Sequence, residues 1–88
     1  MTINTKDLIN KITYRANYRG TKEMDKLLGS FTKKYINQLA LDELQLLCDL
    51  LDCDDENLYK LNQGLETTIK IETNKVTKLL KNYVYISD

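Results

Sequence analysis

The sequence predicts a small all-α protein built from about five short helices. Its 88 residues contain no proline and only three glycines, and apolar residues recur at spacings of three and four along most of the chain. This length is typical of one domain, so we expect residues 1–88 to form a single helical domain. A chain this small cannot both shape a deep substrate pocket and build its walls. A surface that acts on a larger partner is therefore the better expectation.

Two helices are expected on either side of Gly20. The first covers about 5–17, with Thr5 as a candidate N-cap, and it ends before Gly20 because glycine readily adopts the left-handed conformation that closes a helix. The second begins near Thr21. Gly29 inside it costs about 1 kcal/mol relative to alanine, which predicts a neighbouring backbone passing close by. The inward positions are Leu8, Ile9, Ile12 and Ala16, then Met24, Leu27, Leu28, Phe31, Tyr35 and Leu39.

Three further helices are predicted from the remaining apolar pattern. The third covers about 41–52, and Asp54 or Asp55 can cap a short fourth helix over 55–63 that stops at Gly64. The fifth is expected over about 67–84. Its opening is rich in β-branched residues and could be read as a strand, but a lone strand has no partner here, so we prefer the helix. The inward positions are Leu44, Leu47, Cys48, Leu51, Leu58, Leu61, Ile69, Val76, Leu79, Leu80 and Tyr83.

Charge is balanced overall but unevenly distributed. The chain has thirteen basic and thirteen acidic residues. This balance argues against a nucleic-acid partner, because affinity for nucleic acid comes from an excess of Lys and Arg. Residues 1–35 carry eight basic and three acidic side chains, whereas 42–56 carry seven acidic side chains and no basic one. Such a polarised surface can orient on a partner of complementary charge.

The residue types needed for catalysis or metal binding are scarce. The chain has no histidine, so the usual general base is missing. Cys48 and Cys53 lack the spacing of a zinc site, and we expect both to be reduced, small and apolar. No glycine-rich phosphate loop is present, and Ser30 and Ser87 have no partner base in the sequence. We therefore expect neither an enzyme nor a metal site.

The two arginines are the most informative feature of the sequence itself. Arg15 and Arg19 are the only arginines among thirteen basic residues, and they lie one helical turn apart. This usage indicates that a planar guanidinium is needed at this point. Gly20 permits a turn there and leaves the backbone bare. Arg19 could pair with Glu23 to form an exposed knob, and the simpler alternative is a glycine stop with a surface ion pair worth less than about 1 kcal/mol.

The segment Arg19-Gly20-Thr21-Lys22-Glu23-Met24-Asp25 resembles the RGxxE-(L/M)-D signature of the SdhE (YgfY) family of FAD assembly factors. The segment 50–59 is similar to the LL-x-x-x-D-x-D-L-(F/Y) stretch of that family, and the likeness covers about 11–64. Leu61 stands where the family usually has Trp, and Ala40 stands where a Ser cap is common. Other matching positions are Phe31, Leu39, Glu43, Leu47 and Leu51.

This resemblance implies a chaperone for the flavoprotein subunit of succinate dehydrogenase or fumarate reductase. It would promote covalent attachment of FAD to that partner while binding no cofactor itself. Arg19, Gly20 and Glu23 would form the partner-binding site, and Arg15, Tyr18 and Asp25 would form its rim. We expect a monomer when free, in the bacterial cytoplasm, because no signal peptide and no apolar stretch of about 20 residues are visible. Nucleic-acid binding and membrane insertion are not expected.

Two other functions stay open at this point. The first is a helical protein–protein adaptor, unrelated to flavin, that binds through the acidic 42–56 face. The second is a DNA-binding helical domain, which the zero net charge disfavours.

Overall fold

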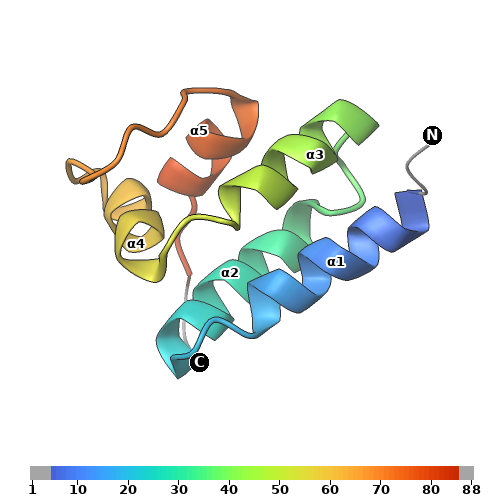
Figure 1. The fold of residues 1–88 in the computed structure, drawn as a ribbon, viewed down its shortest axis with the longest axis horizontal. Helices are drawn as coiled ribbons and strands as arrows, with labels where there is room; N and C mark the ends of the chain where they lie inside the picture. Colours follow the sequence, from blue (N-terminus) through green and yellow to red (C-terminus); the bar gives the residue numbers. More distant parts are fainter. Residues whose placement is uncertain (1–4, 86–88) are drawn as a thin grey trace.

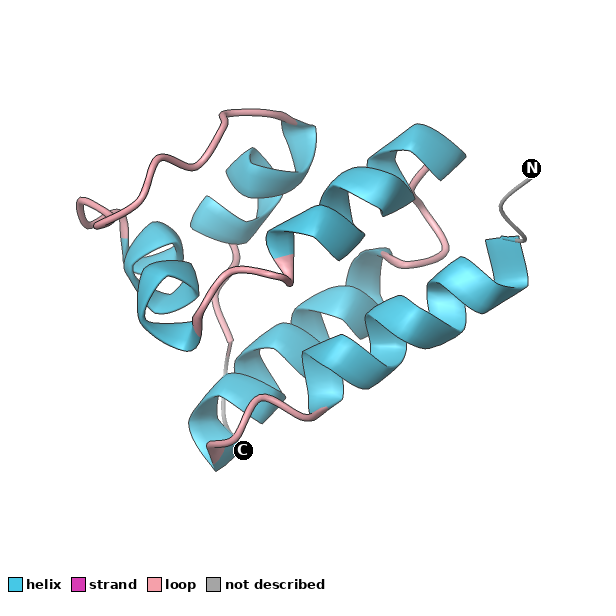
Figure 2. Cartoon of the chain, viewed as in Figure 1, coloured by secondary structure: helices cyan, strands magenta, loops and turns pink. Residues whose placement is uncertain are grey.

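Helices account for all regular structure of the described residues, as the all-α prediction requires (Figure 1). The structure, a computed structural model, describes residues 5–85; Ser87, for which the sequence offers no partner base, lies outside them. The helices are α1 (Thr5–Asn17), α2 (Lys22–Tyr35), α3 (Leu41–Leu50), α4 (Asp55–Gln63) and α5 (Lys75–Lys81). Helices α1 and α2 lie side by side, α3 packs across α1, and α4 and α5 close the other end. No strand occurs in the part of the chain drawn in colour in Figure 2.

All five helices contribute to one buried apolar cluster. Each presents a stripe of residues at helical spacing, and the best-buried side chains from α1, α2, α3, α4 and α5 meet in its centre. The fully buried members are Ile12, Ala16, Leu28, Phe31, Leu47, Leu58, Val76 and Leu80. Most predicted inward positions are therefore confirmed. Leu61, which stands where relatives usually have Trp, is half-buried against this cluster.

Helices α1 and α2 approach each other closely at Gly29. A Cβ atom placed on Gly29 would lie 2.5 Å from Oδ1 of Asn17, so the prediction of a close neighbour is right. The nearest atoms belong to the Asn17 side chain, and the backbone carbonyl oxygen of Ala16 lies 4.0 Å away. Thr21 caps α2 by accepting a hydrogen bond from the Met24 N–H at 3.2 Å. Thr5 is already helical, so its predicted N-cap role is wrong.

The start of α3 and the α3–α4 turn are fixed by acidic side chains. Ala40 occupies the N-cap position of α3 without an oxygen to offer, and Glu43 Oε1 accepts a hydrogen bond from the Ala40 N–H at 2.8 Å. Helix α3 ends at Leu50, two residues earlier than predicted, because the chain turns at Leu51–Cys53. Asp54, one of the two candidate residues, caps α4. Gly64, with φ of +73°, closes α4 as predicted.

The predicted fifth helix is much too long. Residues 65–74 are irregular, neither helix nor strand, and α5 covers only Lys75–Lys81. The β-branched residues of this stretch disfavour helix, and Asn57 Oδ1 accepts a hydrogen bond from the Thr68 N–H at 2.8 Å. Asn74 then caps α5 by accepting from the Thr77 N–H. Ile69, expected to face inward, is 45% exposed, whereas Tyr83 packs against the core from beyond the helix end.

Candidate partner-binding corner

The connection between α1 and α2 forms an exposed turn, which we call the α1–α2 corner (residues 15–25). Helix α1 ends at Asn17 and α2 begins at Lys22. Gly20 has φ of +105°, a conformation that side chains disfavour. No atom lies within 4 Å of a Cβ placed there, so its outer face is open. Glycine is thus required by the backbone, and the bare surface it leaves is accessible to a partner.

The Arg19 side chain points into the molecule. Its Nη1 and Nη2 groups donate to the carbonyl oxygens of Leu51 and Cys53, each at 2.7 Å. Its Nε group donates to Asp55 Oδ1 at 2.8 Å, and the side chain is only 11% exposed. The guanidinium therefore binds main-chain carbonyls at the end of α3 and a carboxylate at the start of α4. Only a planar fork with several donors can serve these three acceptors at once.

Arg15 makes a second, weaker link between the same elements. Its Nη1 group pairs with Asp52 Oδ1 and lies 3.9 Å from the Cys48 sulfur. Its side chain is 32% exposed and that of Asp52 is 60% exposed, so water screens this pair. Arg15 lies on α1 and Arg19 lies two residues beyond its end, and both bind the turn that follows α3. This explains in physical terms why the chain uses arginine at these two positions.

Asp25 closes the corner from the inside. Its Oδ1 accepts a hydrogen bond from the Arg19 backbone N–H, and its own backbone N–H donates to the Thr21 carbonyl at 3.0 Å. The half-buried carboxylate thus fixes the turn around Gly20. Asp25 was predicted to line the rim of a partner contact, and the structure gives it this additional shaping role.

Glu23 lies on the outside of the corner, and the predicted ion pair with Arg19 does not form. Its carboxylate makes neither an ion pair nor a hydrogen bond within residues 5–85. Glu23 lines an open hollow that also includes Tyr59, Gln63 and Val84. The pairing fails because Arg19 is already held by the α3–α4 turn. The Glu23 carboxylate is therefore available to a partner.

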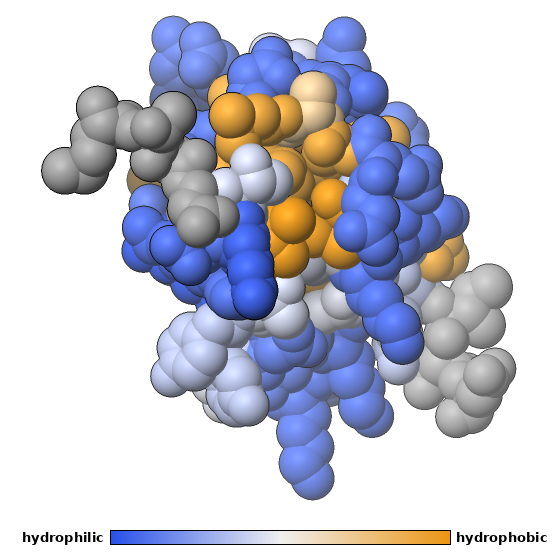
Figure 3. Space-filling model, turned by 90° about the vertical axis from the view of Figure 1, so that its right-hand side faces the viewer, coloured by the Kyte–Doolittle hydropathy of each residue, from blue (hydrophilic) through white to orange (hydrophobic). Residues whose placement is uncertain are grey.

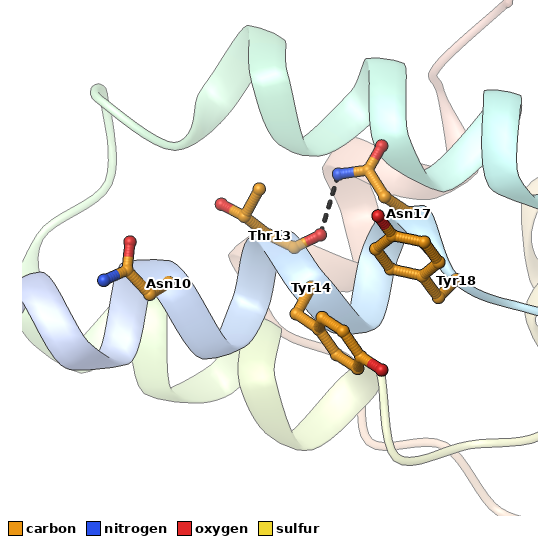
Figure 4. A pocket seen from close by; sticks show the side chains of 5 residues that line it. All are labelled: Asn10, Thr13, Tyr14, Asn17 and Tyr18. Carbon is orange, nitrogen blue, oxygen red and sulfur yellow. Dashed lines mark hydrogen bonds between the residues drawn. The ribbon is translucent and has the colours of Figure 1, made fainter.

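Tyr18 belongs to an aromatic pair that the sequence reasoning missed in part. Its ring lies 4.8 Å from that of Tyr14, centroid to centroid, and the two side chains are 71% and 66% exposed. Figure 4 shows both rings beside Asn10, Thr13 and Asn17 around a shallow pocket on α1. The spacing of four residues between two tyrosines on an outward face is the signal that could have predicted the pair.

The acidic segment 42–56 is largely occupied by contacts within the molecule. Six of its seven carboxylates bind partners: Glu43 with Lys75, Asp49 with Gln45, Asp52 with Arg15, Asp54 with Asn57, Asp55 with Arg19, and Glu56 with Lys60. The Ala40 N–H and Lys75 lower the pKa of Glu43. Hydrogen bonds from Asn57 lower the pKa of Asp54. This face is mostly a set of helix caps and links between helices.

The cysteines are free thiols, as predicted. Cys48 is buried and Cys53 half-buried. Burial, followed by the neighbouring charges of Asp54 and Asp52, raises the pKa of the Cys53 thiol. It therefore stays protonated at neutral pH. No group of three or more His, Cys, Asp or Glu side chains among residues 5–85 could hold a metal ion, and no helix there is long and apolar enough to cross a bilayer.

An apolar surface lies at the far end of α1 from the corner. Figure 3 looks onto this end, where apolar side chains gather between hydrophilic flanks. The start of α1, the α2–α3 connection and the start of α3 meet here (Figure 1). Leu41 is 51% exposed, and Ile9, Ile36 and Leu39 are partly buried. The length of α1 separates this surface from Gly20.

A small all-α protein with a fixed, exposed corner and few catalytic groups fits the class of helical protein-binding factors. The chain belongs to the family described as the flavinator of succinate dehydrogenase, whose sequence profile matches residues 10–84. This match includes the entire α1–α2 corner, and it confirms the resemblance seen in the sequence.

Two relatives carry names of the same kind. The chain is 36% identical over 75 residues to the mitochondrial succinate dehydrogenase assembly factor 2 of Lodderomyces elongisporus, covering 81% of this chain and 46% of the relative. It is 30% identical over 76 residues to the mitochondrial succinate dehydrogenase assembly factor 2-B of Drosophila mojavensis, covering 84% and 48%. The chain thus spans about half the length of these relatives. No solved structure is significantly similar to it.

Proposed function

We propose that this protein binds the flavoprotein subunit of succinate dehydrogenase, or of fumarate reductase, and promotes the covalent attachment of FAD to it. The observation that carries the proposal is the family match over residues 10–84. The names of both relatives, which describe assembly factors for succinate dehydrogenase, support it. The α1–α2 corner is the binding site in this proposal, because it combines the family signature with an open, well-defined surface.

The six predicted site residues divide into two roles. Gly20, Glu23 and Tyr18 face outward and touch the partner. Arg19, Arg15 and Asp25 hold the turn in shape through their contacts with the α3–α4 turn and with the corner backbone. The factor would act by holding the immature partner in the geometry that favours its own flavinylation. It has no histidine to accept the flavin, and we propose that FAD stays on the partner throughout.

The location and the oligomeric state stay predictions. Both relatives are named as mitochondrial. They therefore give no support to the expected location in the bacterial cytoplasm. A monomer in the free state is the expectation that fits a factor acting one-to-one on its partner.

The test is to co-express the protein with the flavoprotein subunit and to measure covalent flavin by its fluorescence after denaturing electrophoresis. Glu23→Gln is the sharpest variant, since it keeps the size of the side chain and removes a charge that forms no ion pair within residues 5–85. Glu66→Gln is the matched control, because Glu66 is also exposed but lies in the 65–74 connection. We expect at least a fivefold loss of flavinylation for Glu23→Gln alone. Equal flavinylation by both variants would remove the proposed site.

The mutagenesis test at Gly20 needs a control for backbone strain. Its φ of +105° means that any side chain strains the turn. A loss of function in Gly20→Arg therefore has two possible causes: the backbone strain and steric obstruction of the partner by the arginine side chain. Comparison with Gly20→Ala separates them, because alanine introduces the same strain with little bulk. We expect Gly20→Ala to retain more flavinylation than Gly20→Arg at equal thermal stability.

The adaptor hypothesis, with binding through the acidic 42–56 face, has less support. Six of the seven carboxylates there already bind groups of the same chain. No separate observation favours that face over the corner.

A further inference from the structure

Three exposed lysines without an ion pair in the described part of the chain lie together on α2. Lys22, Lys26 and Lys33 occupy one stripe of α2, because spacings of four and seven residues return to the same side of a helix. All three are exposed, and none forms an ion pair with any residue in 5–85. While the carboxylates of 42–56 are mostly neutralised internally, these lysines keep their full charge towards solvent.

The lysine stripe is continuous with the exposed tyrosine pair. Asn17, at the end of α1, lines the shallow pocket with Tyr14 and Tyr18. It also lines a second hollow on its other side, together with Lys26, Gly29 and Lys33. The close approach of α1 and α2 at Gly29 brings these two hollows together. We call the combined surface of Tyr14, Tyr18, Lys22, Lys26 and Lys33 the basic–aromatic face.

We propose that the basic–aromatic face docks onto an acidic surface of the protein partner. The lysines speed the encounter, and the tyrosine pair anchors the complex. This rests on the proposed function, in which that partner is the flavoprotein subunit. The face overlaps the α1–α2 corner, since Tyr18 and Lys22 lie within residues 15–25. It therefore extends the contact along α1 and α2, away from the hollow that Glu23 lines.

The charges around this face favour an acidic protein over a nucleic acid. Asp25, the nearest carboxylate on α2, is engaged by the Arg19 backbone N–H. Both arginines, the residues best suited to phosphate, are used inside the molecule. Three lysines give long-range attraction to a carboxylate-rich surface, but a chain of zero net charge lacks the cationic excess of nucleic-acid binders.

The tyrosines are suited to anchoring such a contact. Each offers a large, rigid and amphipathic ring that loses little conformational entropy on binding, and residues of this kind dominate binding energies. At 66% and 71% exposed, with the rings in contact only 4.8 Å apart, they present much apolar area to water in the free protein. Burial under a partner would remove that area from water.

The two parts of the face predict separate kinetic effects. The assay is the binding of the purified protein to the purified flavoprotein subunit, followed by interferometry from 25 to about 300 mM salt. The double variant Lys26→Gln/Lys33→Gln should associate about three to ten times more slowly at low salt, with a flatter salt dependence. Tyr14→Ala/Tyr18→Ala should dissociate at least about tenfold faster with little change in association.

Matched controls exist for both changes. Lys70→Gln/Lys78→Gln makes the same change of charge at exposed positions in the 65–74 connection and in α5. Leu41→Ala removes an apolar side chain that is 51% exposed at the opposite end of α1. Both controls should bind as the unmodified protein does. Circular dichroism and the melting temperature confirm that each variant is folded.

The outcomes distinguish this inference from the proposed function. If the unmodified protein binds the flavoprotein, but the lysine and tyrosine variants match it at every salt concentration, the face is not the contact; the proposed function then stands on Gly20 and Glu23, without Tyr18. Weakened binding confined to the two controls also overturns the inference. Failure of the unmodified protein to bind the subunit overturns both. Retention of duplex DNA that disappears in Lys26→Gln/Lys33→Gln would reassign the face to nucleic acid.

Discussion

Replacing Arg19 by alanine should destabilise the whole protein, even though the residue belongs to the family signature. The Arg19 side chain is only 11% exposed, and besides a 3.4 Å contact with the Arg15 carbonyl its guanidinium makes three short hydrogen bonds, to the Leu51 and Cys53 carbonyls, each at 2.7 Å, and to Asp55 Oδ1 at 2.8 Å. At about 1 kcal/mol of net stabilisation for each hydrogen bond, their loss costs about 3 kcal/mol. A domain of this size has only about 5–10 kcal/mol in total.

The assay is urea and thermal unfolding followed by circular dichroism. We expect the melting temperature of Arg19→Ala to fall by about 12–24 °C. Arg19→Lys should recover about half of the loss, because an ammonium keeps the charge but cannot reach all three acceptors. Arg15→Ala is the control and should cost less than about 1 kcal/mol, since its pair with Asp52 is exposed. An unfolding free energy for Arg19→Ala within 0.5 kcal/mol of the unmodified protein, a threshold at about the noise of surface substitutions, would refute this reasoning.

Three further predictions concern stability. Gly29→Ala, introduced into an Asn17→Ala background, should stabilise the protein by about 1 kcal/mol, because alanine favours helix more than glycine does. The Asn17 side-chain atoms that would clash with the new Cβ are absent in this background. Urea unfolding measures the change, and a lower free energy of unfolding would contradict the prediction. The Oγ1 of Thr32 is buried with no hydrogen-bond partner in the described structure, so Thr32→Val should raise the unfolding free energy by up to about 1 kcal/mol in the same assay. Asp54 has a lowered pKa in the folded state, so its contribution is present above the ordinary carboxyl pKa and is lost as the pH falls through the folded value. Asp54→Asn keeps the helix cap and should flatten the fall in melting temperature below about pH 4; an unchanged pH profile would show that Asp54 is not responsible.

Features that depend on residues nearby in the sequence, such as helix ends and apolar stripes, could be predicted. Gly64 and Asp54 fix the two ends of α4 through their own backbone and side chain, and both positions are confirmed. The apolar stripes of α1 to α4 identified the core, because burial follows helical periodicity. The position of Gly20 at the corner was also predictable, since glycine so often marks the end of a helix.

Elements that depend on distant contacts could not be predicted. Residues 65–74 leave the helical pattern partly because Asn57, about ten residues earlier, binds the Thr68 backbone. Arg19 turns inward to bind the Leu51 and Cys53 carbonyls, which lie more than thirty residues away in the sequence. Sequence spacing favoured Glu23, one helical turn away, as its partner. Local spacing cannot reveal that a stronger set of acceptors comes from another part of the fold.

The seven-residue α5 is held in place by two buried side chains, Val76 and Leu80, and by the amide of Asn62. Asn62 donates to the carbonyls of Leu80 and Tyr83, at 2.8 and 2.9 Å, and the Tyr83 hydroxyl in turn donates to Ser30 on α2. A helix this short does not persist alone in water, so this end of the molecule should open first in thermal fluctuations. The turn that carries the family signature takes no hydrogen bond from α5. The protein can thus loosen at its carboxyl end, including the wall of the Glu23 hollow that Val84 forms, while the turn around Gly20 keeps its shape.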